Sequence, residues 1–342
     1  GHGSSFTCSS FIHSRFAGAM ASRPLEVIGI SGALCAFEFP SHADVARVMQ
    51  MVKDITQIPV HEQRLFVGTQ ELRDLDILVD DLPTDSRSLT LVRRPPEHAE
   101  WIRLIREIGR YLVPPLPGKA WAVFDVVLEA VSLNASAFRL AADELRADRQ
   151  VLLAALTRGL AQGTGGGSGV IMWASEALRA DRDAVLAAVA EDGLALEHAS
   201  SNVRADREVV LAAIAQDGLA LEYASEDLRS DRDVVLAAAA QDGRLLQYAS
   251  DDPRADYDVV LVAVAKNGLA LKYASDDMRA DRDVVLAAVS QDGLALKYAS
   301  DDMCADRDVV LAAVSQDGLV LEYASDDLRA DRVIVLAAVS QD

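Results

Sequence analysis

The chain has 342 residues, a formal charge of −20 and 51% hydrophobic residues. This length is enough for about two domains, and the hydrophobic content excludes a wholly disordered chain. No uncharged apolar run approaches the ~18 residues of a membrane span. The negative charge argues against nucleic acid and anionic membranes as partners, because both would repel the chain, whereas basic protein surfaces would attract it.

The first 24 residues differ in composition from the rest, and we predict that they form a disordered leader or a targeting segment. Residues 1–19 contain five serines, Arg15 and no acidic residue, a composition typical of a transit segment. Met20 followed by Ala21 and Ser22 equally resembles a start site, so a translated leader and organellar targeting both stay open. Three widely separated cysteines favour a reducing, cytoplasmic compartment.

Residues 25–94 are predicted to form a sheet packed on one helix. Val45, Val48, Met49 and Val52 fall at helical spacing. The predicted strands are a hairpin from Leu25 to Phe39 that turns at Ser31-Gly32, then Gln63 to Val67, and Leu89 to Val92. This combination is a β-grasp fold.

The same span resembles ubiquitin, without a gap from Leu25 to Arg94. The residues that carry the resemblance are Ile58-Pro59, Glu62 to Leu65, Leu72, Asp74, Leu78, Leu89, Leu91 and Val92. The resemblance implies a domain that binds ubiquitin-like-domain receptors through a hydrophobic patch, whose three positions fall on Ile30, Phe66 and Val92. Strand alternation supports two of them, because it directs Leu65 and Leu91 inward and Phe66 and Val92 outward.

Two departures from ubiquitin concern its attachment to other proteins. Arg93-Arg94 is followed by Pro95-Pro96 and not by a terminal Gly-Gly, and Lys53 is the only lysine in the span. We therefore expect an integral domain that is neither conjugated nor extended into chains.

Residues 95–120 are predicted to be a linker helix and a proline-rich turn. Trp101, Leu104, Ile105, Ile108 and Leu112 form an amphipathic stripe that ends before Pro114-Pro115. Such a helix would join the ubiquitin-like domain to the remainder of the chain.

Residues 121–342 are a tandem repeat with a period of 25 residues. The pair Ala-Ser recurs at this interval from Ala174-Ser175 to Ala324-Ser325, and Val126 to Arg149 aligns on Val284 to Arg307, so two degenerate units precede the regular ones. Eight additional residues around the glycine-rich stretch 163–169 predict a flexible insertion. The period indicates a stacked array, which also carries the charge: residues 171–342 hold 34 acidic and 16 basic side chains.

One unit, residues 276–300, shows the expected helices. Asp281 is a natural N-cap, and Asp292-Gly293 is expected to end the first helix. Leu294 to Ala299 predicts a second short helix, and Ser300 to Asp302 a turn into the next unit. A leucine-rich repeat is excluded, because asparagine is scarce and Leu-Ala-Ala-Val favours a helix. The fold class is therefore α+β: a β-grasp domain followed by an all-α solenoid of two-helix repeats.

The repeats resemble an uncharacterised family of short helical tandem repeats of algal and protist proteins, some of which also contain a ubiquitin-like module. The matching residues are Leu-Arg-Ala-Asp-Arg, as at Leu178 to Arg182, followed by Val-Leu-Ala-Ala-Val. Because the function of that family is unknown, the resemblance implies the fold and little else.

Two repeated columns vary in an informative way. An aromatic column is expected to pack between units or to line a groove; it comprises Trp173, His198, Tyr223, Tyr248, Tyr273, Tyr298 and Tyr323. The preceding column changes the sign of its charge, which indicates a solvent-facing position; it comprises Glu197, Glu222, Gln247, Lys272, Lys297 and Glu322. We interpret this second column as a candidate for partner selection, with a neutrally drifting surface as the alternative.

Local breaks in the repeat predict where the array is softest. Pro253 replaces Leu or Met, Tyr257 and Cys304 replace arginines, and Val333 replaces an aspartate. Two breaks fall within residues 253–257, so hydrogen exchange should be fastest there. The chain also stops after the first helix of a unit, which predicts that it is a fragment.

The residue pattern predicts no catalytic residues, no cofactor and no metal site. The acidic residues repeat identically from unit to unit, as helix caps do and a single catalytic dyad does not. The leading hypothesis is a non-enzymatic adaptor that binds proteins through its ubiquitin-like domain and its acidic array. The alternative is a purely structural acidic array with a vestigial ubiquitin-like domain.

Overall fold

The computed structural model describes residues 22–29, 32–40, 43–68, 70–72, 78, 88–108, 115–162 and 166–340. The chain divides into two compact units, with the boundary between Ile108 and Gly109. We call the first unit the head and the second the array. Residues 1–21 of the predicted leader 1–24 and the patch residue Ile30 lie outside the described residues. Residues 22–24 belong to the first strand, so the prediction of a disordered segment is wrong for them.

The head contains a mixed sheet of five strands in the order β2-β1-β5-β3-β4. The strands are β1 (Ser22–Gly29), β2 (Gly32–Pro40), β3 (Gln63–Val67), β4 (Gln70–Glu71) and β5 (Ser88–Arg93). β1 pairs antiparallel with β2 and parallel with β5, and β3 pairs antiparallel with β5. The predicted β-grasp arrangement is confirmed, and β1 begins at Ser22, before the expected Leu25.

Helix α1 (Val45–Thr56) supplies the other layer of the head. Asp44 caps it by accepting a 2.7 Å hydrogen bond from the N–H of Arg47. Its buried residues are Val45, Val48, Met49 and Val52, as the helical spacing predicts, and they form one core with Val27, Leu65, Leu89 and Leu91 of the sheet. The described core of the head thus joins α1 to the inner face of the sheet.

Helix α2 (Pro96–Ile108) belongs to the head and contacts the short 3-10 helix η1 (Val60–Glu62). It buries Ala99, Trp101, Ile102 and Ile105, whereas Ile108 is exposed. The predicted stripe was therefore wrong in register on two counts, since it omitted Ile102 and included Ile108. The buried face of α2 includes Ala99, which is fully buried. The prediction considered only large apolar side chains and therefore placed this face a little too far around the helix.

In the array, each regular unit contains three helical segments. A representative unit has α10 (Arg207–Gln216), the 3-10 helix η7 (Gly218–Tyr223) and the one-turn helix α11 (Glu226–Arg229). The repeated solenoid is confirmed, but the expected turn after the second helix is the start of a third, one-turn helix. Serine at the turn caps that helix: Ser225 accepts a hydrogen bond from the N–H of Leu228.

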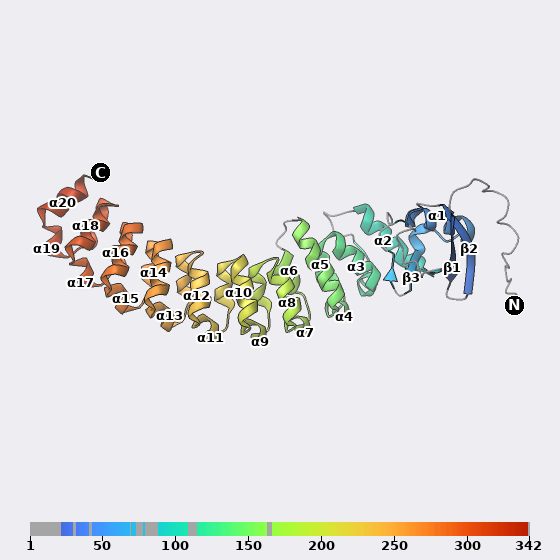
Figure 1. The fold of residues 1–342 in the computed structure, drawn as a ribbon, viewed down its shortest axis with the longest axis horizontal. Coiled ribbons are helices and arrows are strands. Elements are labelled where there is room, and N and C mark those ends of the chain that lie inside the picture. The colour runs from blue at the N-terminus through green and yellow to red at the C-terminus, as the bar shows by residue number, and fades with distance from the viewer. Residues whose placement is uncertain are drawn as a thin grey trace. The chain divides into compact units, whose positions relative to one another are not determined.

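Successive long helices lie side by side along the array (Figure 1). The remaining regular units repeat the same order with these bounds: α7 (Glu176–Arg179), α8 (Arg182–Val189), η6 (Gly193–His198), α9 (Ser201–Arg204), α12 (Arg232–Ala239), η8 (Gly243–Tyr248), α13 (Asp251–Ala255), α14 (Tyr257–Lys266), η9 (Gly268–Tyr273), α15 (Asp276–Ala280), α16 (Arg282–Gln291), η10 (Gly293–Tyr298), α17 (Asp301–Cys304), α18 (Arg307–Val314), η11 (Gly318–Tyr323), α19 (Asp326–Arg329) and α20 (Arg332–Val339). In α10, Val209, Val210, Ala213 and Ile214 are buried between α8 and α12, which explains the apolar composition of the long helices.

The glycine that follows each long helix has a different role from the one predicted. The residue that ends α16 is Asp292, in an extended conformation, and Gly293 opens the following 3-10 helix. A Cβ on Gly293 would lie 2.7 Å from the carbonyl oxygen of Ala313 in the next unit, and one on Gly243 only 2.0 Å from that of Ala263. Glycine is required because two units approach closely, not because it supplies a left-handed helix end.

A main-chain hydrogen bond also crosses each boundary between units. The N–H of Ser225 donates to the carbonyl of Arg204 at 2.9 Å, and equivalent bonds recur in the other units up to Ser325 and Cys304. The ladder begins with Ala142 and Trp121 at 2.8 Å, in the degenerate units. Those units contain η4 (Gly118–Ala122), α3 (Phe124–Leu133), η5 (Ala135–Leu140) and α4 (Asp143–Arg146), which confirms that the array extends back to them.

The glycine-rich insertion is partly helical. Helix α5 (Arg149–Gln162) is longer than α10, and α6 (Gly166–Ile171) follows it within the stretch predicted to be flexible. α6 contacts α5, α8 and η6, so it takes the place that a 3-10 helix has in the regular units. The prediction of a flexible loop is therefore wrong for residues 166–169, and residues 163–165 lie outside the described part.

Candidate protein-binding surfaces

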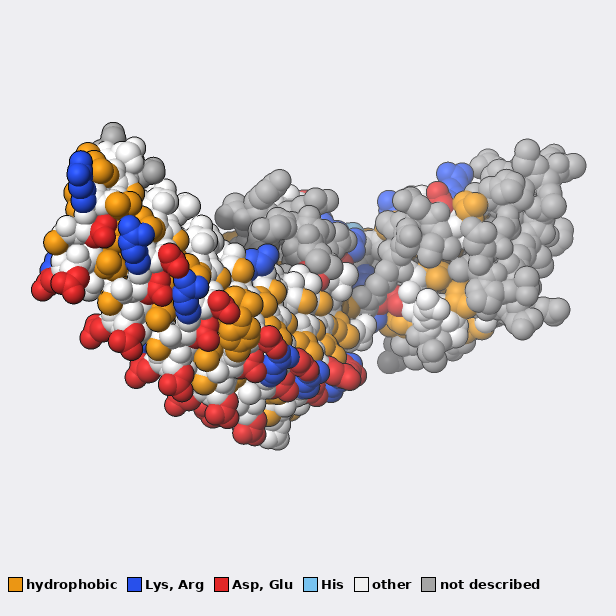
Figure 2. All heavy atoms as spheres, turned by 60° about the vertical axis from the view of Figure 1, so that its left-hand side comes forward, with side chains coloured by type: hydrophobic (Ala, Val, Ile, Leu, Met, Phe, Trp, Pro, Cys, Tyr) orange, Lys and Arg blue, Asp and Glu red, His pale blue; other side chains and the backbone are white. Residues whose placement is uncertain are grey.

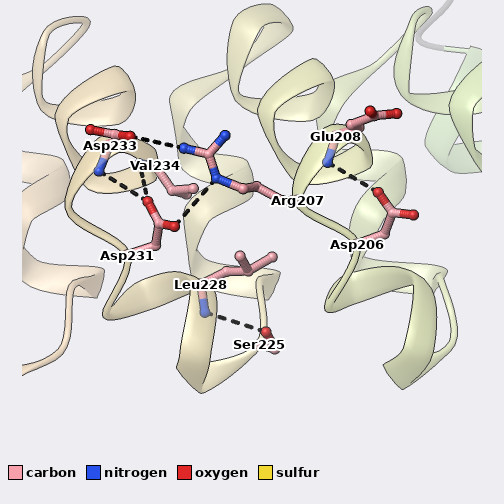
Figure 3. A network of polar contacts seen from close by, with 8 residues as sticks. All are labelled: Asp206, Arg207, Glu208, Ser225, Leu228, Asp231, Asp233 and Val234. Carbon is pink, nitrogen blue, oxygen red and sulfur yellow. Dashed lines mark hydrogen bonds and ion pairs between the residues drawn. The ribbon is translucent and has the colours of Figure 1, made fainter.

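In several units of the array, one arginine forms ion pairs with two carboxylates of the next unit. Arg207 donates from Nε to Asp231 at 3.3 Å and from Nη2 to Asp233 at 3.0 Å (Figure 3). The other oxygen of Asp231 accepts hydrogen bonds from the N–H groups of Asp233 and Val234, both at 3.0 Å, and so caps α12. One aspartate thus caps its own helix and binds the preceding unit.

We call each such contact of one arginine with two acids a rung. The filled rungs join Arg149 to Asp181 and Asp183, Arg182 to Asp206 and Glu208, Arg207 to Asp231 and Asp233, Arg232 to Asp256 and Asp258, and Arg282 to Asp306 and Asp308. The rungs are largely exposed, so each contributes little alone.

Two of the capping aspartates, Asp306 and Asp256, illustrate how the contacts lower the pKa of a carboxyl. The N–H of Val309 donates to Asp306 and lowers the pKa of that carboxyl; partial burial opposes the effect, and the Arg282 guanidinium adds to it. Asp256 shows the same pattern with Val259 and Arg232. These carboxylates are therefore held in the charged form by both their contacts.

One rung within the array is open. Tyr257 occupies the position of the arginine, and no described side chain forms an ion pair with Asp281 or Asp283. Pro253 lies four residues earlier, in the one-turn helix α13, and has no N–H to donate to the capping serine, Ser250. The Ser250 hydroxyl instead donates to Glu226 at 2.7 Å. Two stabilising contacts are thus missing around residues 253–257, where the fastest exchange is predicted.

The charge column lies on the 3-10 helices, at their fifth residue. Glu197, Glu222, Lys272, Lys297 and Glu322 are all exposed. Lys297 Nζ lies 5.8 Å from the centre of the Tyr323 ring in the next unit, and Lys272 Nζ lies 5.5 Å from that of Tyr273. The charge column faces solvent as the sequence indicates, and part of it touches the aromatic column.

The aromatic column is half-buried from His198 to Tyr323, and Trp173 is more exposed. Burial raises the pKa of Tyr248, and the neighbouring Glu222 carboxylate raises it further. The rings therefore both pack between units and contribute to the outer surface of the 3-10 helices.

On the head, the outer face of the sheet holds the two described patch residues. Leu65 and Leu91 are buried partners across β3 and β5, whereas Phe66 and Val92 on the other face are partly exposed. The predicted inward and outward alternation is confirmed.

The patch has a polar rim that the sequence did not predict. The Arg64 guanidinium carbon lies 5.0 Å from the centre of the Phe66 ring, and Arg64 donates twice to Glu71, at 2.8 and 3.0 Å. Arg94 donates to the same carboxylate at 3.2 Å. A partner that contacts Phe66 must therefore accommodate or displace a guanidinium.

A further charged feature is an acidic edge along the one-turn helices. In most units this helix begins with exposed acidic residues, as at Asp276-Asp277 and Asp301-Asp302. Figure 2 shows these side chains as a row along one edge of the array, beside a second row that contains the basic side chains. The net charge is thus arranged in rows and is not spread evenly.

Among the described residues, no group of three or more His, Cys, Asp or Glu side chains is placed to hold a metal ion. No described helix combines the length and apolar character needed to cross a bilayer. Cys304 lies alone, and burial raises the pKa of its thiol, which makes it a poor nucleophile.

Comparison with known proteins supports both modules. Residues 206–254, 256–304 and 306–342 match the family described as a domain of unknown function (DUF4116), and each full match spans two 25-residue units. The chain is also 29% identical over 133 residues to ubiquitin-like protein 4A of Plecturocebus moloch, a match that covers 39% of this chain and 82% of the relative. The chain therefore combines a region similar to a ubiquitin-like protein with repeats that match this family model.

These relatives suggest an interaction module, and neither indicates a catalytic family. The sequence prediction missed the rungs and the glycine contacts, although both recur with the 25-residue period. Their signal was the constancy of Arg207 and Gly218 and of their equivalents in successive units. A charged residue that recurs next to a helix cap in every unit can form an ion pair with the neighbouring unit.

Proposed function

We propose that the protein is a non-enzymatic adaptor, in which the head binds receptors of ubiquitin-like domains and the array holds a second protein with a basic surface. The observation that carries the proposal is the outer face of β3 and β5. Phe66 and Val92 stay partly exposed there and are not members of the described core of the head. A surface that folding does not use is available for a partner.

The rim of that patch indicates which partner helix fits. Arg64 covers part of the Phe66 ring and Arg94 is close by, so the patch is apolar with cationic neighbours. An amphipathic helix with an apolar anchor and a flanking carboxylate would suit it, because the carboxylate can compete with Glu71 for the guanidinium.

The array contributes surfaces of both signs. Its acidic edge favours basic proteins, and the charge column changes from Glu222 to Lys272 and back to Glu322. Such a pattern selects partners by complementary charge along the array more than it adds affinity. We propose that this column, with Glu197 and Lys297, sets which protein the array holds.

One observation favours the alternative, a structural array with a vestigial head. The Arg64–Glu71 pair and the cation over Phe66 satisfy the outer face within the head itself. Under this alternative the patch would bind nothing, and replacing Phe66 would leave the captured proteins unchanged.

Affinity capture with the full chain separates the two functions. Phe66→Asp should lose the head-dependent partners, and Ile55→Asp on α1, an exposed residue away from the patch, is the matched control. Circular dichroism would establish that both variants fold. Identical captured proteins from the wild type and Phe66→Asp would refute the adaptor proposal.

We also propose that the protein acts in the cytoplasm. The support is indirect: three scattered cysteines, of which Cys304 is free, suit a reducing compartment. Fractionation of cells that express the native protein tests this, and recovery in an organelle would contradict it.

A further inference from the structure

We infer that the open rung beside Tyr257 is a binding site for an arginine side chain of a partner protein, received by Asp281 and Asp283. The inference deepens the proposed binding of basic proteins by the array and rests on it. It names the carboxylates of Asp281 and Asp283 as the site and a guanidinium as the group that they bind.

The array itself shows what the site binds. Five equivalent pairs of acids each hold a guanidinium, and in four of them arginine Nε lies 3.0–3.3 Å from the capping aspartate. The acids at the open rung occupy the same positions in their unit. An acidic cluster alone would not indicate a ligand, but these equivalent pairs identify the ligand directly.

The carboxylate of Asp281 is already oriented for the contact. One of its oxygens accepts hydrogen bonds from the N–H groups of Asp283 and Val284, both at 3.0 Å. Asp231, in the filled rung, holds its own N–H partners at the same distances. The second oxygen of Asp281 corresponds to the one that binds Arg207 in that rung, and it has no described partner.

No neighbouring arginine of the array can fill the rung. Arg282 is committed to Asp306 and Asp308 at 3.1 and 2.7 Å, and Arg232 to Asp256 and Asp258. Neither arginine of the adjacent rungs in the described part of the chain is thus free for Asp281 and Asp283, so we assign the cation to another molecule.

Tyr257 adds a second reason for arginine. Its side chain is 41% exposed at the position from which arginine extends in the filled rungs. A planar guanidinium can stack on such a ring while its fork binds two carboxylates, whereas a lysine ammonium offers only a point charge. The site should therefore prefer arginine to lysine.

The test is an NMR titration of the isotope-labelled full chain with Nα-acetyl-arginine N-methylamide. We expect saturable shifts at the backbone amides of Asp283 and Val284, with an apparent affinity at least threefold higher than for the corresponding lysine compound. Equal affinities, or equal shifts at the acids of the filled rungs, would overturn the inference.

Two pairs of variants complete the test. Tyr257→Arg should reduce the shifts at least fivefold by filling the rung from within, whereas Leu294→Arg, on an exposed residue outside the rungs, should not. Asp283→Asn should weaken binding at least threefold, whereas Asp277→Asn on the acidic edge should not. Binding that survives Tyr257→Arg and Asp283→Asn refutes the site without refuting capture of proteins by the rest of the array.

Discussion

The head and the array differ in how far apart in the sequence the contacting residues lie. In the head, Val27 of β1 pairs with Leu89 of β5, and both enter one core with α1. In the array, the same contact recurs at each boundary between adjacent units, as where the N–H of Ser225 donates to the carbonyl of Arg204. The head should therefore fold and unfold as a whole, whereas damage to the array should stay within a few units.

The largest expected effect tests the cooperativity of the head. Leu65→Ala removes a fully buried side chain, which should cost about 2–5 kcal/mol. Hydrogen exchange should accelerate throughout the described part of the head and stay unchanged from α8 to α20. Faster exchange in the array would show that the two units are coupled.

The next effect tests the close approach of units. Gly243→Ala places a Cβ 2.0 Å from the Ala263 carbonyl, and overpacking of this kind costs about 1–3 kcal/mol. Exchange should accelerate in η8 and α14 only. Gly169→Ala is the control, because its Cβ would meet nothing within 4 Å. Equal effects of the two variants would remove the packing explanation for the glycines.

A smaller effect separates capping from ion pairing. Asp306→Ala loses both contacts and should cost about 1 kcal/mol at pH 7, whereas Asp306→Asn keeps the cap and should cost less. Because the folded pKa of Asp306 is lowered, its contribution is present above the unfolded pKa of about 3.9 and is lost as the pH falls through the folded value. Urea unfolding from pH 7 down to pH 2 measures this, and an Asp306→Ala deficit that stays constant over that whole range would contradict it.

The smallest effect concerns the open rung. Tyr257→Arg should restore the ion pairs to Asp281 and Asp283 and stabilise the array by less than about 1 kcal/mol, since the pair is exposed. Exchange should slow in α14 and α16 and approach that of the filled units. If the wild-type array is already protected uniformly, the softness of residues 253–257 would be disproved.

The fold could be predicted because both units repeat or resemble known patterns. Strand alternation placed Leu65 inward and Phe66 outward, and the 25-residue period predicted the stack. The contacts between units could not be predicted, because a period shows which residues are equivalent and not which residues of adjacent units touch. Gly293 was expected to end a helix, and only the position of Ala313 reveals its actual constraint.

The candidate surfaces were predicted less completely for a related reason. Exposure of Lys272 and Glu222 follows from their change of sign, which a buried position would not tolerate. The guanidinium over Phe66 depends on the register that sets Arg64 opposite Val92 and Phe66 opposite Glu71, and a single strand does not carry that register. The acids of the open rung became a candidate only once the filled rungs were seen.

The central claim, that the head and the array bind different proteins, is tested most directly by capturing partners with two variants of the full chain. Phe66→Asp changes the head, and the double variant Glu222→Lys with Lys272→Glu rearranges the charge column without altering the net charge. We expect each variant to lose a set of proteins that the other retains. Loss of the same proteins by both variants, or of none by either, would contradict the claim.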